Sequence, residues 1–182
     1  MIGSIDAFLR YFDAVQRRAI RDIAALPQAA DGWTPPAGEG EKAWNVNKIV
    51  GHICGSRLYF ASAYLGNGWV SPRPPDVSTR DRWLPALEAS AVALRERLAG
   101  TPDAWLERKV PLIDSEGELS GWRILMLMME HDIHHRSQLD TYAGLNGWDV
   151  PDIYNRSAEH IGTLQDAQLA KHGRMNERPN QI

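Results

Sequence analysis

Apolar side chains recur along the first part of the chain with the spacing of a helix. Between Ser4 and Leu26 they occupy positions Ile5, Phe8, Leu9, Phe12, Val15, Ala19, Ile20 and Ile23. Steps of three and four residues place these side chains on one face of an α-helix, whereas a half-buried strand would alternate every second residue. Ser4 can cap the start and Pro27 follows the end. The pattern therefore predicts a first helix over residues 4–26.

Three further segments show the same helical periodicity. They cover residues 45–65, 80–98 and 122–145. Asn45 is a good N-cap for the first of these segments. The last of them contains no proline, and its one glycine, Gly144, lies at the far end. A helix of about six turns fits it.

The connections between these helices differ in composition. Residues 28–44 and 66–79 are rich in proline and glycine, which predicts loops. Residues 105–120 contain only a short, proline-broken apolar run, which predicts an irregular crossover with a short extended pair. A fifth, weaker helix is expected over residues 152–172, and residues 173–182 are expected to form a frayed tail.

Four long helices, one of them reached through a long crossover, predict an all-α four-helix bundle with a C-terminal helical extension. The chain has 182 residues and 43% hydrophobic content, which suits one globular domain over residues 1–182. The net charge of −3 gives no electrostatic case for nucleic acid or an anionic membrane as a partner.

The expected location is the cytoplasm. The N-terminus lacks the apolar core of a signal peptide, and no apolar run approaches the length of about 18 residues that a membrane span needs. Cys54 is the only cysteine, so an intrachain disulfide cannot form.

Candidate chemistry begins with two histidines on the predicted fourth helix. His131 and His135 are four residues apart, so their Cβ atoms lie about 5 to 6 Å apart on one face. The same face carries apolar side chains, and an imidazole without a partner is costly in a core. A lone inward histidine is more often a hydrogen-bonded core residue than a metal ligand. A third histidine would favour a metal site, because catalytic zinc sites commonly use three protein ligands.

His52 is the candidate for the third histidine. It lies about 60° around the predicted second helix from Ile49, at the margin of the apolar face. A side chain in that place can reach a cleft between helices.

Two stretches of the sequence resemble the DinB/YfiT-like superfamily of metal-dependent enzymes. The first is Glu-Lys-Ala-Trp-Asn-Val-Asn-Lys-Ile-Val-Gly-His over residues 41–52, and the second is His-Asp-Ile-His-His-Arg-Ser-Gln-Leu over residues 131–139. The resemblance spans nearly the whole chain. Two departures are Ser137, where the family usually has glycine, and the chain of about 30 residues beyond the fourth helix.

The resemblance implies a four-helix bundle that binds one divalent metal ion, usually zinc or nickel. One histidine from the second helix and two from the fourth are the ligands, and the matching positions here are His52, His131 and His135. Several members of the family are S-transferases or isomerases that use a low-molecular-weight thiol such as bacillithiol or mycothiol. The family also suggests a homodimer formed through exposed helix faces.

The chemistry of such a site agrees with that implication. Three neutral imidazoles leave the ion its full charge, which lowers the pKa of a bound water to about 7 or holds a thiol as thiolate. The expected function is a hydrolase or thiol-dependent S-transferase acting on a small molecule, with that water or thiolate as nucleophile. The alternative is a non-catalytic ligand-binding or dimerisation bundle in which the metal is structural or absent.

Several neighbouring residues have two interpretations. Ligand histidines donate their second N–H to an acceptor, and Asp132, Gln138, Asp140 or a backbone carbonyl could provide it. Arg136 could bind a substrate carboxylate, but an ion pair to another helix is favoured. His134 points about 100° away from His135 and is expected beside the site or at the surface.

Three other kinds of metal site are less consistent with the sequence. The run from His131 to His135 mimics the H-E-x-x-H helix of zinc proteases, with the shorter Asp132 in the general-base position. A di-iron bundle needs two Glu-x-x-His motifs, and this sequence has none. A closed structural zinc site wants a fourth ligand, but Cys54 points about 200° around the helix from His52 and is expected in the core.

Overall fold

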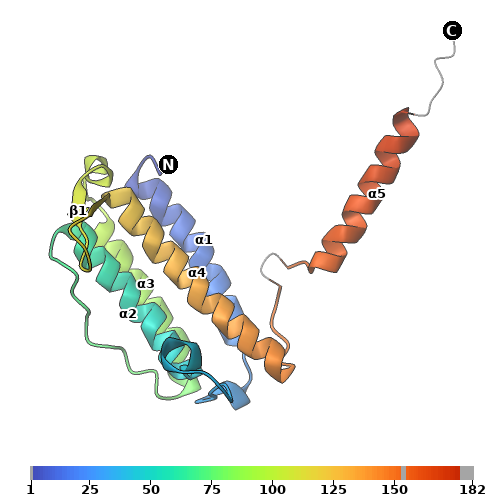
Figure 1. Ribbon diagram of the computed structural model, residues 1–182, viewed down its shortest axis with the longest axis horizontal. Coiled ribbons are helices and arrows are strands. Elements are labelled where there is room, and N and C mark those ends of the chain that lie inside the picture. The colour runs from blue at the N-terminus through green and yellow to red at the C-terminus, as the bar shows by residue number, and fades with distance from the viewer. Residues whose placement is uncertain (1, 153–154, 177–182) are drawn as a thin grey trace, which may run out of the picture. The chain divides into compact units, whose positions relative to one another are not determined.

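The computed structural model describes residues 2–152 and 155–176. The chain forms two compact units, Met1–Val150 and Pro151–Ile182. Four long helices make up the first unit (Figure 1): α1 (Ile5–Ala25), α2 (Val46–Leu65), α3 (Trp83–Leu98) and α4 (Gly121–Asn146). The all-α helical bundle expected from the sequence is confirmed.

The predicted caps of the first two helices are present. The Ser4 side chain accepts a hydrogen bond from the Ala7 backbone N–H, and Asn45 accepts one from the Lys48 N–H. Gly66 ends α2 in the left-handed conformation with φ 83°. Glycine adopts this conformation without the steric cost that a Cβ brings. Local sequence signals therefore fix the limits of α1 and α2.

The third helix begins later than predicted. Residues Arg80–Arg82 form a 3₁₀ turn, and the α-helix starts only at Trp83. The Arg80 Nε donates to the Leu26 carbonyl at 2.8 Å, and the Arg80 backbone N–H donates to Asp31 at 3.1 Å. These long-range bonds hold Arg80 against the end of α1, so the first turn is not a regular α-helical turn.

The crossover before α4 contains the short extended pair expected from its sequence. Strands β1 (Lys109–Pro111) and β2 (Glu118–Ser120) pair antiparallel, with Val110 opposite Leu119. The remaining short turns of this unit are 3₁₀ helices: Gln28–Ala30, Gly40–Ala43 and Asp103–Leu106. The turn Gly40–Ala43 lies against α4, where the Glu41 carbonyl accepts a hydrogen bond from Gln138.

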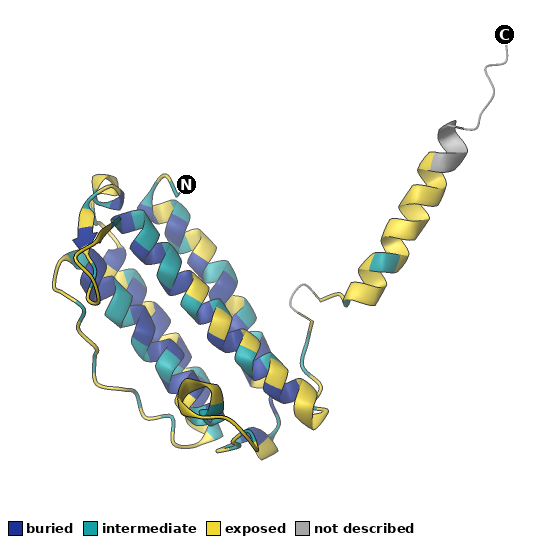
Figure 2. Ribbon diagram, viewed as in Figure 1, coloured by how far each residue is buried: buried dark blue, intermediate teal, exposed yellow. Residues whose placement is uncertain are grey.

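The helices of this unit bury their apolar faces against one another (Figure 2). Helix α2 packs against α3 and α4, and α1 packs against the same two helices. The start of α4 lies so close to Trp105 and Tyr64 that only a glycine fits there. A Cβ at Gly121 would collide with the Trp105 carbonyl and would lie 2.9 Å from the Tyr64 ring.

A buried ion pair joins α2 to α4 inside this core. The Arg57 Nε and Nη2 lie 2.8 and 2.7 Å from Asp132 Oδ2, and both side chains are almost fully buried. The Arg57 Nη1 also donates to the Leu87 carbonyl and to Ser90 Oγ of α3. One guanidinium thus ties three helices together.

The second unit contains helix α5 (Ala158–Asn176), whose described side chains are largely exposed. It starts six residues later than predicted, because Asn155 has a φ of 59°, which an α-helix cannot accommodate. It also extends beyond residue 172, so residues 173–176 of the predicted tail are helical. Residues 177–182 of that tail, and 153–154, lie outside the described residues.

The described part of the chain contains no helix with the length and apolarity that a membrane crossing requires.

We expect Asp132→Asn to lower the free energy of unfolding of the metal-free protein by about 3–5 kcal/mol, because the Arg57 charge would stay buried without its partner. Asp13→Asn is the matched control. It breaks the half-exposed pair between Asp13 and Arg95 and should cost less than about 1 kcal/mol. Urea unfolding of both variants tests this expectation. Equal, small losses would show that the buried pair does not hold the helices together.

Candidate metal centre

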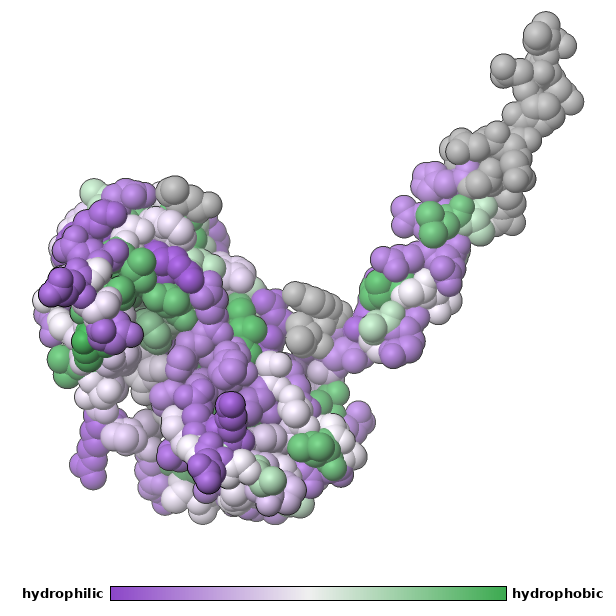
Figure 3. Space-filling model, viewed as in Figure 1, coloured by the Kyte–Doolittle hydropathy of each residue, from purple (hydrophilic) through white to green (hydrophobic). Residues whose placement is uncertain are grey.

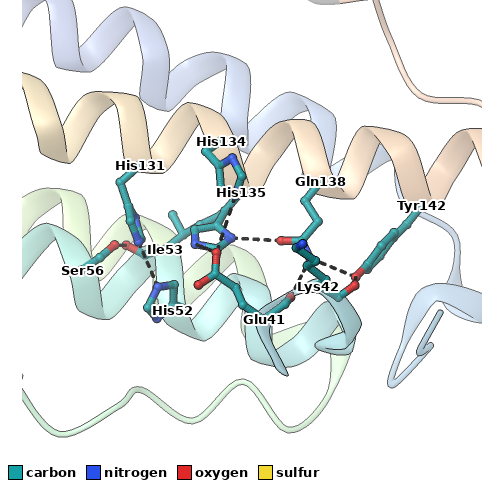
Figure 4. A network of polar contacts seen from close by, with 10 residues as sticks. All are labelled: Glu41, Lys42, His52, Ile53, Ser56, His131, His134, His135, Gln138 and Tyr142. Carbon is teal, nitrogen blue, oxygen red and sulfur yellow. Dashed lines mark hydrogen bonds and ion pairs between the residues drawn. The ribbon is translucent and has the colours of Figure 1, made fainter. Parts of the chain in front are cut away.

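The structure brings the three predicted ligands together. His52 on α2 faces His131 and His135 on α4 (Figure 4), and the Nε2 atoms of His52 and His131 are 3.0 Å apart. One ring nitrogen from each of the three histidines lies within 4.8 Å of the others. Two nitrogens bound tetrahedrally to one zinc ion are separated by about 3.3 Å, given bonds of about 2.0 to 2.1 Å. The spacing therefore suits a single divalent ion.

A chain of hydrogen bonds orients His135. Its Nδ1 lies 3.1 Å from Gln138 Oε1, and the Gln138 Nε2 donates to the Glu41 carbonyl and to the Tyr142 hydroxyl. These two acceptors fix the amide, so that Oε1 faces His135 and receives the Nδ1–H. The Nε2 of His135 then carries the lone pair that a metal needs. Of the acceptors considered from the sequence, Gln138 is the one that serves this ligand.

Burial keeps the three imidazoles neutral. It lowers the pKa of His131 to about 3, with further lowering from His135 and His52. The pKa values of His52 and His135 are also lowered, in each case mainly by burial. A neutral imidazole is the form that binds a metal ion. The three candidate ligands therefore need not lose protons before a metal ion binds.

The buried His135 Nε2 is also the strongest sign that a cation fits here. His135 is completely buried, and its Nε2 has no hydrogen-bond partner among residues 2–152 and 155–176. A buried polar atom without a partner is costly. A divalent ion between the three histidines would remove that cost.

Glu41 lies beside this centre, on the 3₁₀ turn Gly40–Ala43. Its Oε1 is 3.8 Å from His135 Nε2 and 3.5 Å from His134 Nε2. Glu41, His134 and His135 form a second group that could hold a metal ion, but this group uses the same buried histidine and two exposed side chains. No local pattern in the sequence predicts Glu41 as a site residue. The only signal was its position at the start of the stretch that resembles the DinB/YfiT-like superfamily.

Trp44 packs beside two of the three histidines, His52 and His135. Its ring lies 4.8 Å from the His52 ring and stacks 6.0 Å from the His135 ring, measured between centroids. The Lys48 ammonium lies 4.3 Å from the Trp44 ring. The indole therefore shields the ligand nitrogens from water on that side.

The remaining candidates from the sequence lie away from the ligand nitrogens. Asp132 is occupied by its ion pair with Arg57, which removes the general base that a zinc-protease site would need. Arg136 lies 3.5 Å from Asp22 of α1, in the ion pair that the sequence favoured. Burial raises the pKa of Cys54 to about 11, so this core thiol is not a thiolate ligand.

A cavity of about 630 Å³ opens on the His52 and His131 side of the centre. Its volume is typical of sites for small molecules. An ion held by the three histidines would therefore adjoin a space large enough for a substrate.

We expect Gln138→Leu to weaken zinc binding by about 10- to 100-fold, because His135 would lose the acceptor that orients it. Thr141→Val is the control, since that exposed hydroxyl bonds only within α4 among the described contacts. Competition with a chromophoric chelator measures both affinities. Zinc binding in Gln138→Leu as tight as in the parent would show that the hydrogen bond does not support the ligand.

The stability of the metal-free protein should depend on pH through His131. The folded pKa of about 3 lies below the ordinary value of 6.5, so the unfolded chain binds more protons between these two values. Stability should therefore fall as the pH is lowered from about 6.5. His131→Asn should lose less stability between pH 7.5 and 5 than the parent in urea unfolding, whereas His160→Asn on α5 should follow the parent. Parallel losses in the parent and His131→Asn would contradict this assignment.

Comparison with known proteins assigns the fold to a family. The chain is similar to a DinB-like protein from Bacillus cereus, with 16% identity, a TM-score of 0.65, and coverage of 84% of this chain and 99% of the other. It is also similar to a DinB-like protein from Bacillus subtilis, with 19% identity, a TM-score of 0.60, and coverage of 80% and 96%. No curated protein matches the sequence. The model of the DinB family matches residues 1–168. The chain belongs to the DinB family.

Proposed function

We propose that this protein is a metal-dependent enzyme that promotes nucleophilic attack on a small molecule. His52, His131 and His135 would hold one divalent ion, zinc or nickel. The observation that carries the proposal is the convergence of three neutral imidazole nitrogens, one of them buried and without a partner, beside a cavity.

The arrangement favours chemistry over a purely structural metal. Structural zinc sites are closed by four protein ligands, whereas catalytic sites keep a position free. Cys54, the candidate for a fourth ligand, is buried in the core as a thiol. The other candidate ligand groups beside His135 are Glu41 and His134, whose side chains are 52% and 66% exposed. A position next to the cavity is thus available to a substrate.

A divalent ion in this place would supply positive charge that lowers the pKa of a bound water or thiol. Side chains of the protein would orient the ion's ligand, limit the access of water and accept a proton. Gln138 keeps His135 in the tautomer that binds metal, and Trp44 limits the access of water. The Glu41 Oε1, within 4 Å of His135 Nε2, is placed to accept a proton from the nucleophile.

The nucleophile in this proposal is water or a low-molecular-weight thiol, which gives a hydrolase or an S-transferase. Family membership supports the metal site, since the matched stretches contain the ligand positions of the family, and thiol-dependent members of the family support the S-transferase. The proposed location is the cytoplasm, where such thiols are kept reduced. A homodimer through exposed helix faces belongs to the same proposal.

Metal content of protein purified without an affinity tag tests the ligand set. We expect about one equivalent of zinc or nickel in the parent, as one ion on three histidines implies, and its loss in His52→Ala and His135→Ala. His134→Ala is the matched control and should keep the metal. Its side chain is 66% exposed and belongs only to the second group, with Glu41 and His135. Elemental analysis gives the result directly.

Metal-loaded protein would then be assayed for ester hydrolysis and for thiol consumption in the presence of electrophiles. Failure of the parent to bind zinc or nickel would overturn the proposed enzyme. It would leave the non-catalytic ligand-binding bundle as the function.

A further inference from the structure

We propose that the cavity beside the three histidines binds an amphiphilic anion. This ligand is a small molecule with an apolar body and one carboxylate close to its reacting atom. The identity of this ligand as a substrate rests on the proposed function. Its binding depends only on the cavity.

The cavity follows one face of α2. The residues that this helix contributes recur every three or four positions from Lys48 through His52 and Gly55 to Tyr59 and Phe60. The rise along the helix axis from Lys48 to Phe60 is about 18 Å, so the cavity is elongated along this axis. His52 lies one turn from the Lys48 end, and the two aromatic rings lie about two turns beyond it.

The opposite wall comes from the segment between α2 and α3, which runs alongside α2 (Figure 1). Pro72, Pro74, Pro75 and Val77 line the cavity from this segment. Figure 3 shows an apolar area near the β1 end of α2 and α4, bordered by polar side chains. The body of a ligand in this cavity would therefore contact mostly carbon.

The absence of a side chain at Gly55 leaves the cavity open along α2. Glycine in the interior of a helix is destabilising relative to alanine, so a reason for it is expected. At Gly51 the reason is packing, because a Cβ there would lie 2.9 Å from the Val77 side chain. At Gly55 a Cβ would meet no atom within 4 Å. The fold does not need a glycine at Gly55, whereas a ligand lying along α2 would need the room.

Lys48 gives the cavity its charge. It is the only Lys or Arg among the residues that line the cavity, and none of them carries a carboxylate. Lys48 makes no ion pair within the described residues, and its ammonium stays 4.3 Å from the Trp44 ring. Its position four residues before His52 places the Cβ atoms of these two residues about 5 to 6 Å apart, so an anion bound to Lys48 would lie at the His52 end of the cavity. The carboxylate of a ligand would thus lie at the same end as the reacting atom.

Octanoate and 1-octanol are the probes, because they share an apolar body and differ in charge. Isothermal titration of the full chain, with metal and after chelation, measures their affinities. The parent should bind octanoate about fivefold more tightly than octanol, as one partly exposed ion pair allows. Lys48→Met should remove this difference in the metal-free protein while leaving octanol binding unchanged.

Gly55→Leu should weaken the binding of both probes about tenfold or more, because its side chain would fill the cavity. Gly144→Leu is the matched control. It makes the same change at a glycine inside helix α4. A Cβ at Gly144 would also meet no atom within 4 Å, but Gly144 does not line the cavity. Its affinities should equal those of the parent.

Two results would overturn this inference. Equal binding of octanoate and octanol by the metal-free parent would exclude the anion site, and unchanged binding in Gly55→Leu would exclude the cavity. Both results are independent of metal. A chain that binds octanoate as expected but takes up no zinc or nickel would refute the proposed enzyme and support the ligand site.

Discussion

The buried ion pair between Arg57 and Asp132 is the constraint on which the candidate centre depends. An unpaired charge in the core is costly, so α2 and α4 are held in the one register that joins these two side chains. Asp132 follows His131 directly in the chain, and Arg57 lies five residues after His52. A slip of one helical turn between α2 and α4 would move a side chain by about 5.4 Å. It would separate Arg57 from Asp132 and His52 from His131. The same contact that stabilises the core therefore sets the distance between ligands on different helices.

The loop before α2 also contributes to the centre. The backbone carbonyl of Glu41 accepts a hydrogen bond from Gln138, and those of Lys42 and Trp44 lie within hydrogen-bond reach of the Tyr142 hydroxyl. These contacts hold the turn Gly40–Ala43 against α4. They also place the Trp44 ring beside His52 and His135 and the Glu41 carboxylate within 4 Å of His135 Nε2.

Sequence could predict what depends on local periodicity and capping. The limits of α1 and α2, and the shared face of His131 and His135, follow from spacing along one helix. His52 lies at the margin of an apolar face, so helical spacing made it a candidate, and the family resemblance gave it the role of a metal ligand. The place of Glu41 and the late start of α3 after Arg80 depend on hydrogen bonds between residues far apart in the chain, which no local pattern contains.

Burial of Cys54 has a consequence for the reactivity of the chain. With a pKa of about 11, this thiol is ionised in only about one molecule in ten thousand at pH 7, and its side chain is 1% exposed. Thiolates, not thiols, react with alkylating and oxidising agents. The only cysteine of the chain, two residues from His52, is thereby protected from covalent damage by reactive compounds.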